Sequence, residues 1–426
     1  MIFRPTKLAQ ALLLVIAFAL VLGIALGRPE LFAVALPLLV ALLPGTRRGS
    51  NEVPQVVLTG DAETRFEGEE LAITISARLP AVRGVVQIIP VLPTLFRPLG
   101  ARRSPDLVSR GGQPLSWRCR ARCEAAGILH FDAVVLRLFD FSGLWAGEWQ
   151  ERQRFAVTVL PRALPVTRLP PPRHTGALFG AHASPASGAG VAFAEIRPFA
   201  AGDRLREINW PVSLRRRVLH TNRFHTDRQA EVVLLIDTFT VIGERPHSSL
   251  DHVLRAAAGI AAAVLRRHDR VGLLEYGGIA RSAGSGTGEG QYLRILHALA
   301  RSAPLQTEFA QDLAALPEQV LSRRAFVLAL TPLADQRFER AVIRLAQRGQ
   351  DVALLALMTD ELSAGLVRPR DLHPLVRRLW RVERAERLRA LRRVGVRASN
   401  WSTAAPLDSA MGNLLAESHA LARRAA

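Results

Sequence analysis

A long apolar run lies near the N-terminus of the chain. Residues Leu8–Gly27 are twenty consecutive residues without a charged side chain. In a helix with a rise of 1.5 Å per residue, this run extends about 30 Å, which matches the hydrocarbon thickness of a bilayer. A second apolar run, Leu31–Pro44, follows after a short polar break. Together they predict a transmembrane helical hairpin within residues 1–50, with residues 8–44 contacting membrane lipid.

Basic residues flank both ends of the predicted hairpin. Arg4 and Lys7 precede it, and Arg47 and Arg48 follow it. Because basic residues accumulate on the cytoplasmic side of membrane spans, both ends are predicted to face the cytoplasm. The rest of the chain is then a cytoplasmic body anchored in the inner (plasma) membrane. A signal peptide over Leu8–Leu26 is the alternative interpretation, and the second apolar run argues against it.

Residues 51–165 have the pattern of a β-rich domain. Short alternating or β-branched runs recur there and are separated by Gly, Pro, Asp and Asn. These runs are Val56–Thr59, Leu71–Ala77, Val85–Val91, Ile128–Leu138 and Phe155–Leu160. Few stretches show helical periodicity, so this region is predicted to form a β-sandwich-like domain of antiparallel strands.

A linker is predicted over residues 166–190. It contains the three consecutive prolines Pro170–Pro172 and then the small-residue run Ala181–Gly190, a composition typical of connecting segments. The sequence pattern changes again beyond this linker, which marks the start of a last domain over residues 191–426.

Strands alternate with helices through most of that last domain. The predicted strands are Val232–Asp237, Arg270–Tyr276, Ala325–Leu330, Val352–Met358 and Gly395–Ser399, and the predicted helices are Leu250–Arg266, Gln291–Ala300, Gln311–Leu321, Asp335–Gln347, Pro374–Val394 and Leu407–Arg424. Such alternation predicts a doubly wound parallel sheet covered by helices on both faces. Residues Val218–Phe224 are predicted to add an antiparallel edge strand to it. The predicted fold class is therefore α/β plus all-β.

A dense polar motif precedes the first strand of this α/β domain. The candidate binding or organising residues are those of this motif together with Asp237 at the end of the strand that follows: Arg197, Gly202, Asp203, Arg206, Asn209, Trp210, Arg215 and Asp237. Gly202-Asp203 suits a tight turn, and Asp203 is predicted to cap a short helix over residues 204–210. Trp210 is predicted to anchor this element against the sheet. Since Asp–Arg pairs of this kind are commonly architectural, a brace is preferred to a catalytic site.

The same motif resembles the signature of a bacterial family called domain of unknown function 58, roughly Arg-x-Tyr-x-Pro-Gly-Asp-x-x-Arg-x-Ile-Asp-Trp. Asn209 stands where that family usually has Asp. The α/β region is similar to a von Willebrand factor A-type domain, and His268–Leu274 resembles the step after its first helix. The resemblance implies a membrane-anchored interaction or scaffold protein. It also implies a MoxR-type AAA+ ATPase as partner, in the assembly or activation of other complexes.

Active von Willebrand A-type domains hold a divalent cation through Asp-x-Ser-x-Ser at the end of the first strand. In this chain Asp237 occupies the first position, whereas Phe239 and Val241 occupy the two hydroxyl positions. Neither of these side chains offers the oxygen ligands that Mg²⁺ requires. The cation site is therefore predicted to be degenerate, and neither a cofactor nor a catalytic residue is predicted.

Two alternatives to a non-enzymatic interaction protein remain open. One is a metal-dependent hydrolase that uses Asp237 and Asp335. The other is nucleic-acid binding, suggested by the net charge of +19 and by Arg215–Arg217. The absence of a nucleic-acid-binding motif and the sparse aromatic residues around these arginines argue against nucleic acid as the partner. Cys119 and Cys123 alone are too few for a structural zinc site.

Overall fold

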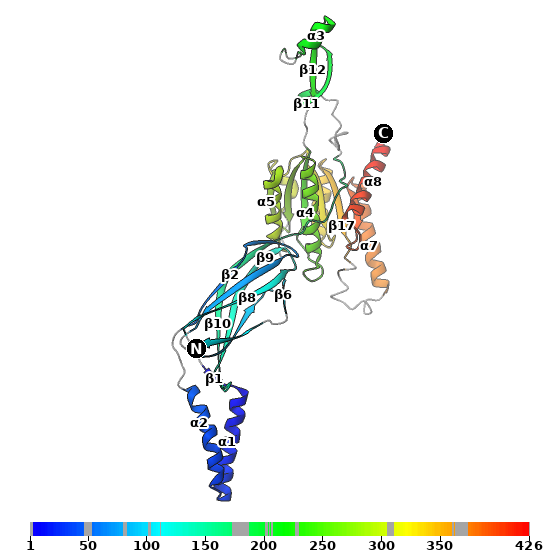
Figure 1. Cartoon of the computed structure of the whole chain (residues 1–426). Coiled ribbons are helices and arrows are strands. Elements are labelled where there is room, and N and C mark those ends of the chain that lie inside the picture. The colour runs from blue at the N-terminus through cyan, green and yellow to red at the C-terminus, as the bar shows by residue number, and fades with distance from the viewer. Residues whose placement is uncertain are drawn as a thin grey trace. The chain divides into compact units, whose positions relative to one another are not determined.

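The structure is a computed structural model. It describes residues 3–46, 53–79, 83–100, 104–110, 112–172, 187–200, 203, 205, 208–225, 230–304, 311–359, 362 and 374–425. The chain divides into two compact units, Met1–Leu160 and Pro161–Ala426. Helices and strands are present in both units (Figure 1), so the predicted mixture of helical and β structure is confirmed.

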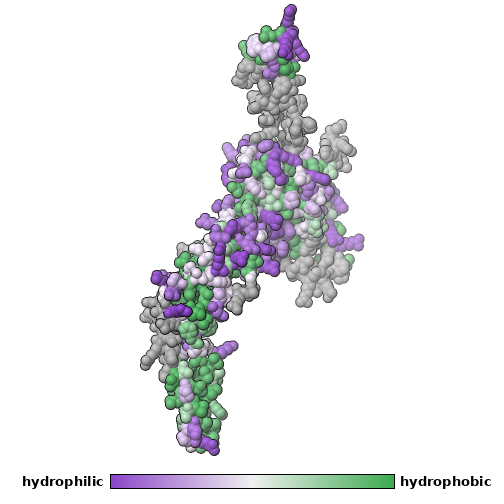
Figure 2. Space-filling view, in the orientation of Figure 1, coloured by the Kyte–Doolittle hydropathy of each residue, from purple (hydrophilic) through white to green (hydrophobic). Residues whose placement is uncertain are grey.

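Near its N-terminus, unit 1 has a pair of apolar helices, α1 (Lys7–Leu26) and α2 (Glu30–Thr46). The side chain of Thr6 caps α1, and Gly27 ends it in the left-handed conformation that glycine favours. A few side chains, including Ile16 and Ala35, pack between the helices, but most apolar side chains of α1 are exposed. Figure 2 shows this hydrophobic surface. In the described part of the chain, only α1 is long and apolar enough to cross a membrane, while α2 is a shorter apolar helix.

Two sheets form the rest of unit 1. The six-stranded sheet has the order β1 (Phe3–Pro5), β10 (Trp145–Leu160), β9 (Gly127–Phe139), β5 (Arg83–Val91), β7 (Asp106–Arg110), with β3 (Thr64–Phe66) also paired to β10. The four-stranded sheet has the order β2 (Gln55–Gly60), β4 (Glu70–Arg78), β8 (Pro114–Cys123), β6 (Phe96–Leu99). All pairs are antiparallel except β3 with β10. Inward side chains of both sheets share one apolar core.

The turn between β9 and β10 joins this sheet to the N-terminal helices. Asp140 is buried there and accepts hydrogen bonds from the Trp145 backbone and the Ser142 hydroxyl. The Thr6 hydroxyl donates to the Gly143 carbonyl at 2.9 Å, and the indole of Trp145 donates to the Leu42 carbonyl at 3.3 Å. Both helices are therefore tied to the same corner of unit 1.

Unit 2 is built on a six-stranded sheet with helices on both faces. The strand order is β15 (Ala280–Gly286), β14 (Arg270–Tyr276), β13 (Glu231–Asp237), β16 (Phe326–Thr331), β17 (Asp351–Leu357), β18 (Arg397–Trp401), and only β15 is antiparallel. The helices are α4 (Ser249–Arg266), α5 (Gly288–Ala300), α6 (Gln336–Gln347), α7 (Pro374–Arg393) and α8 (Leu407–Ala425). The central strands are continuous apolar runs because both of their faces are buried.

Three predicted elements of the last domain differ in the structure. The helix predicted over Gln311–Leu321 is wrong, because the described residues there form only the short 3₁₀ helix η2 (Leu313–Ala315). The edge strand predicted over Val218–Phe224 is present as β12 (His220–His225). It pairs with β11 (Ser187–Pro198) in a separate two-stranded sheet rather than with β13. The antiparallel edge strand of the sheet is β15, which was not predicted.

The described part of the predicted linker packs on unit 2. The Thr167 backbone N–H and hydroxyl both donate to the carboxylate of Asp408 at 2.7 Å. Arg266 donates to the Val166 carbonyl, and the buried Arg397 donates to the Pro171 carbonyl. These bonds pair several backbone N–H and C=O groups of the proline-rich segment. They hold this segment against α4 and α8. Residues 173–186 of the predicted linker lie outside the described residues.

Candidate functional site

The first candidate site lies at the carboxyl edge of the unit 2 sheet. The chain leaves β13 toward β14 on one side and leaves β16 toward β17 on the other. In open parallel sheets, ligands bind at the point where successive connections diverge in this way. Asp237 ends β13 and Thr331 ends β16 at this point, so these two residues occupy the position where chemistry is expected.

The carboxylate of Asp237 is buried and fully engaged with neighbouring groups. The Thr331 hydroxyl donates to Asp237 Oδ2 at 2.6 Å, and the Phe239 backbone N–H donates to Asp237 Oδ1 at 3.0 Å. The same Thr331 hydroxyl accepts a bond from the Leu333 backbone N–H at 2.8 Å. Burial raises the pKa of Asp237 to about 7, although the bonds from Thr331 and Phe239 act in the opposite direction. The residue therefore links the ends of two strands.

Phe239 occupies the space beside this carboxylate. Its ring is buried and meets Tyr276 edge to face with centroids 4.9 Å apart. The guanidinium carbon of Arg337 also lies 4.3 Å from the centroid of this ring. Thus the neighbours of Asp237 include an aromatic ring and an arginine. A bound divalent cation would require oxygen ligands at these positions instead.

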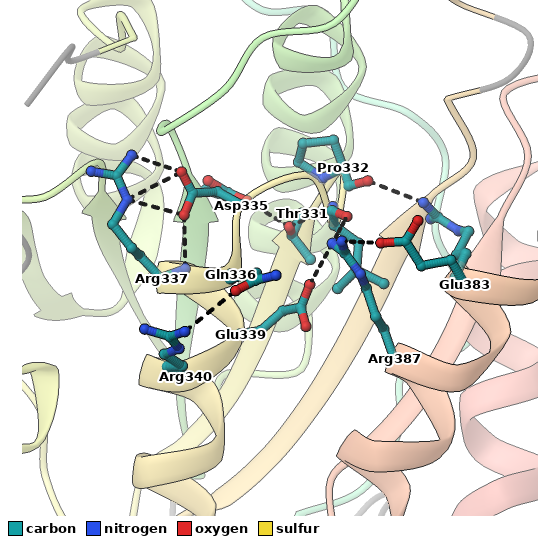
Figure 3. Close-up of polar contacts among 12 residues, drawn as sticks. Thr331, Pro332, Asp335, Gln336, Arg337, Glu339, Arg340, Glu383 and Arg387 are labelled. Atoms are coloured by element: carbon teal, nitrogen blue, oxygen red, sulfur yellow. Dashed lines mark hydrogen bonds and ion pairs between the residues drawn. The ribbon is translucent and has the colours of Figure 1, made fainter. Parts of the chain in front are cut away.

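Asp335 holds Arg337 in this position (Figure 3). Its two carboxylate oxygens accept from Arg337 Nε at 3.0 and 3.2 Å and from Nη2 at 2.7 Å. Burial alone raises the pKa of Asp335, but the bonds and charge of Arg337 outweigh it and lower that pKa. The two carboxylates of the hydrolase alternative, Asp237 and Asp335, are therefore engaged by different partners.

These residues do not fit a divalent cation. Phe239 and the partly buried Val241 supply no oxygen ligand, and Asp335 is paired with an arginine. Among the residues that the structure describes, no group of three or more His, Cys, Asp or Glu side chains could hold a metal ion. No reaction step is therefore assigned to a metal here.

A pocket of about 260 Å³ lies at the same edge of the sheet. The segments that follow β16 and β17 and one face of α7 line it, and its lining includes Trp380, Arg384 and Arg387. Arg384 donates to the Pro332 carbonyl at 3.0 Å, to the Leu357 carbonyl at 2.6 Å and to Asn400 Oδ1 at 3.0 Å. One arginine thus holds the carboxyl ends of three strands together. This role of Arg384 is not predicted from the sequence, although arginines at every third position of the helix could have indicated it.

The second candidate site is the hairpin of β11 and β12, which carries α3 (Trp210–Arg216) between its strands. Arg197 Nη2 contacts Asp203 Oδ1 at 2.6 Å, and the Ala200 backbone N–H donates to Asp203 Oδ2 at 2.9 Å. The Asn209 amide group donates to Asn222 Oδ1 at 2.8 Å. The polar residues of the motif therefore fix the conformation of the hairpin itself. Gly202 and Arg206 lie outside the described residues.

The predicted anchor of this motif is wrong, and the helix predicted over residues 204–210 does not extend to Trp210, because the described residues Ile208 and Asn209 are not helical. Residues 204, 206 and 207 lie outside the described residues, so the cap at Asp203 stays a prediction. A helix that was not predicted, α3, begins at Trp210 with Pro211 in its first turn, and Asn209 caps it, because its side chain accepts from the Val212 backbone N–H at 3.1 Å. Trp210 itself is 59% exposed, so it is not a buried anchor.

Helix α3 and the residues that follow it have an exposed face of mixed apolar and basic character. We call it the α3 face and define it as Trp210, Leu214, Val218 and Leu219 with Arg215–Arg217. Leu214 is 76% exposed, and Val218 and Leu219 are also exposed. The three arginines stand among these apolar residues and are exposed as well. Figure 2 shows hydrophobic and hydrophilic surface side by side over α3.

Comparison with known proteins identifies the family of this region. Residues 195–391 match the family model described as "Protein of unknown function DUF58". The chain carries a DUF58 region. The resemblance drawn from the signature motif is thereby confirmed, and the DUF58 region includes the α3 face, the carboxyl edge of the sheet and most of α7.

The other comparisons add little to this. No curated protein matches the chain. One similar solved structure is the crystal structure of Spo0M, a sporulation control protein from Bacillus subtilis, at 12% sequence identity and a TM-score of 0.16. The match covers 25% of this chain and 49% of that one, so it spans about half the length of Spo0M. A likeness this low carries no argument about function.

Proposed function

We propose that this protein is a membrane-anchored interaction protein, rather than an enzyme, and that its DUF58 region presents a docking surface to a protein partner. The observation that carries the proposal is the α3 face. Trp210 and Leu214 are held on a hairpin whose polar residues are internally bonded, yet both side chains point to solvent. Exposed aromatic and aliphatic side chains interspersed with arginine are the usual composition of binding hot spots.

The anchor in this proposal is α1, with α2 as the second helix of a transmembrane hairpin. Exposed apolar side chains along α1 support this, since a bilayer would remove them from water. The basic residues Arg4 and Lys7 before α1, and Arg47 and Arg48 after α2, support a cytoplasmic location for both soluble parts.

The partner class in this proposal is a MoxR-type AAA+ ATPase, acting with this protein in the assembly or activation of another complex. Membership in the DUF58 family supports this choice. We also propose that the α/β body of unit 2 is a von Willebrand A-like domain, a scaffold suited to presenting loops at the carboxyl edge of its sheet. Its parallel strand order and its two helical layers support that assignment.

A native pull-down tests the proposal. The full chain would be solubilised from its own membranes in mild detergent, as wild type, as Leu214→Glu and as Leu293→Glu. Leu293 is the matched control, because it is also an exposed leucine on a helix of unit 2 but lies on α5. We expect an AAA+ ATPase to be recovered with the wild type and with Leu293→Glu, and to be lost with Leu214→Glu. Equal recovery with all three proteins would contradict the proposed docking surface.

A further inference from the structure

Helix α7 exposes apolar side chains that the docking proposal does not use. Leu375 and Leu379 are each 65% exposed, and Val382 is 53% exposed. Val376 and Trp380 beside them are also exposed. All five lie in the first half of the helix, whereas the apolar side chains of its second half, Leu388 and Leu391, are buried in the unit 2 core.

Helical geometry places Leu375, Leu379 and Val382 on the face opposite the two buried leucines. At about 100° per residue, Leu375, Leu379 and Val382 fall within an arc of about 60°. Leu388 and Leu391 fall about 180° from the middle of that arc. The exposed set therefore forms a stripe directed away from the sheet, and core packing does not account for it. We call it the α7 stripe.

Basic residues border the α7 stripe. The helix contains eight arginines and two glutamates. Arg378 and Arg381 are exposed within the apolar half, and Arg389 and Arg393 are exposed further along. A helix with an apolar stripe and flanking arginines has the composition of segments that lie in the membrane–water interface.

We infer that the α7 stripe lies against the headgroup layer of an anionic membrane, with its leucines among the upper acyl chains and its arginines on acidic headgroups. This inference rests on the proposed anchoring by α1, which tethers the chain to a bilayer. The charge of α7 complements anionic lipid, and the excess of basic over acidic residues in the whole chain acts in the same direction. Membrane contact would hold the DUF58 region in one orientation for its partner.

Site-specific fluorescence tests this inference on the full chain. Leu379→Cys, in a Cys119→Ser, Cys123→Ala background, would carry an environment-sensitive fluorophore, and the protein would be reconstituted in two kinds of nanodisc. One kind contains phosphatidylcholine only, and the other also contains phosphatidylglycerol. A second label, at Val382→Cys, repeats the measurement in case the substitution at position 379 disturbs the helix locally. A label at the exposed Ser282→Cys on β15 is the control.

We expect a blue-shifted emission at positions 379 and 382 only in the anionic discs, with quenching by spin-labelled acyl chains and reversal by salt. Charge reversal in Arg378→Glu/Arg381→Glu should remove most of the shift. Identical emission in both kinds of disc would overturn the inference, as would a blue shift that appears only when a protein partner is added. Co-elution with discs reports the α1 anchor separately, so failure of the anchor is distinguishable from failure of the α7 stripe.

Discussion

The carboxyl edge of the unit 2 sheet and the α3 face belong to the same DUF58 region, but they differ in the exposure of their side chains. At the carboxyl edge, Asp237, Thr331 and Phe239 are buried and bonded to one another. On the hairpin, the polar residues are bonded while Trp210 and Leu214 are exposed. A closed cluster stabilises the fold, whereas an open apolar surface is available to a partner. This contrast supports the proposal that the α3 face serves recognition, whereas the carboxyl edge stabilises the fold.

Truncation of one aromatic residue in each region gives the largest contrast. Phe239→Ala removes a buried ring that contacts both Tyr276 and Arg337, so we expect a loss of about 3–5 kcal/mol in the free energy of unfolding of unit 2. Trp210→Ala, at an exposed position, should change it by less than about 0.5 kcal/mol. Hydrogen exchange of β13 under increasing urea measures both. Similar losses for the two variants would remove the distinction between the regions.

The bond between β13 and β16 should have the next largest effect. Thr331→Val leaves the buried Asp237 carboxyl without its hydroxyl donor, and it also leaves the Leu333 backbone N–H without its acceptor. We expect a loss of about 2–3 kcal/mol, seen as faster exchange of β16 amides. Thr331→Ser keeps the hydroxyl and is the control, with a much smaller loss expected. If Ser and Val are equally damaging, the hydrogen bond is not the source of the effect.

The pH dependence of stability should reveal the burial of Asp237. Burial raises its pKa from 3.8 to about 7, so the folded state holds this proton more tightly than the unfolded state. The resulting stabilisation is complete below about pH 4 and is lost as the pH rises toward 7. We expect the unfolding free energy to fall by up to about 1.4 kcal/mol per pH unit in this window. Subtracting the profile of Asp237→Asn isolates this residue from other buried carboxyls, and parallel profiles would argue against its titration.

The central part of the fold was predictable because burial leaves a strong pattern. The strand at Arg270–Tyr276 has the predicted bounds, since apolar residues fill both faces of a central parallel strand. The edge strand β15 was missed because Ala280–Gly286 consists mainly of small and polar residues at an exposed edge. In unit 1, β8 was missed although Trp117, Cys119 and Ala121 alternate with arginines, a period-two pattern that we did not use.

The contacts of the candidate sites were less predictable than their positions. Asp237 was placed correctly at the end of its strand, but its bond to Thr331 joins residues 94 positions apart and leaves no local signal. The cap of α3 could have been predicted locally. Asn209 is a good capping residue, and Pro211 directly after the helix start favours it there.

The smallest expected effect concerns the internal bonding of the hairpin. Asp203→Asn removes one charge of the Arg197–Asp203 pair, which is mostly shielded from solvent, so we expect a local loss of about 1 kcal/mol. It should appear as faster exchange of β11 and β12 amides with no change in β13, and as weaker partner recovery. Glu148→Gln, which breaks the exposed pair with Arg137, is the control and should have no measurable effect on exchange. Unchanged hairpin exchange in Asp203→Asn would mean that the α3 face does not depend on this ion pair for its conformation.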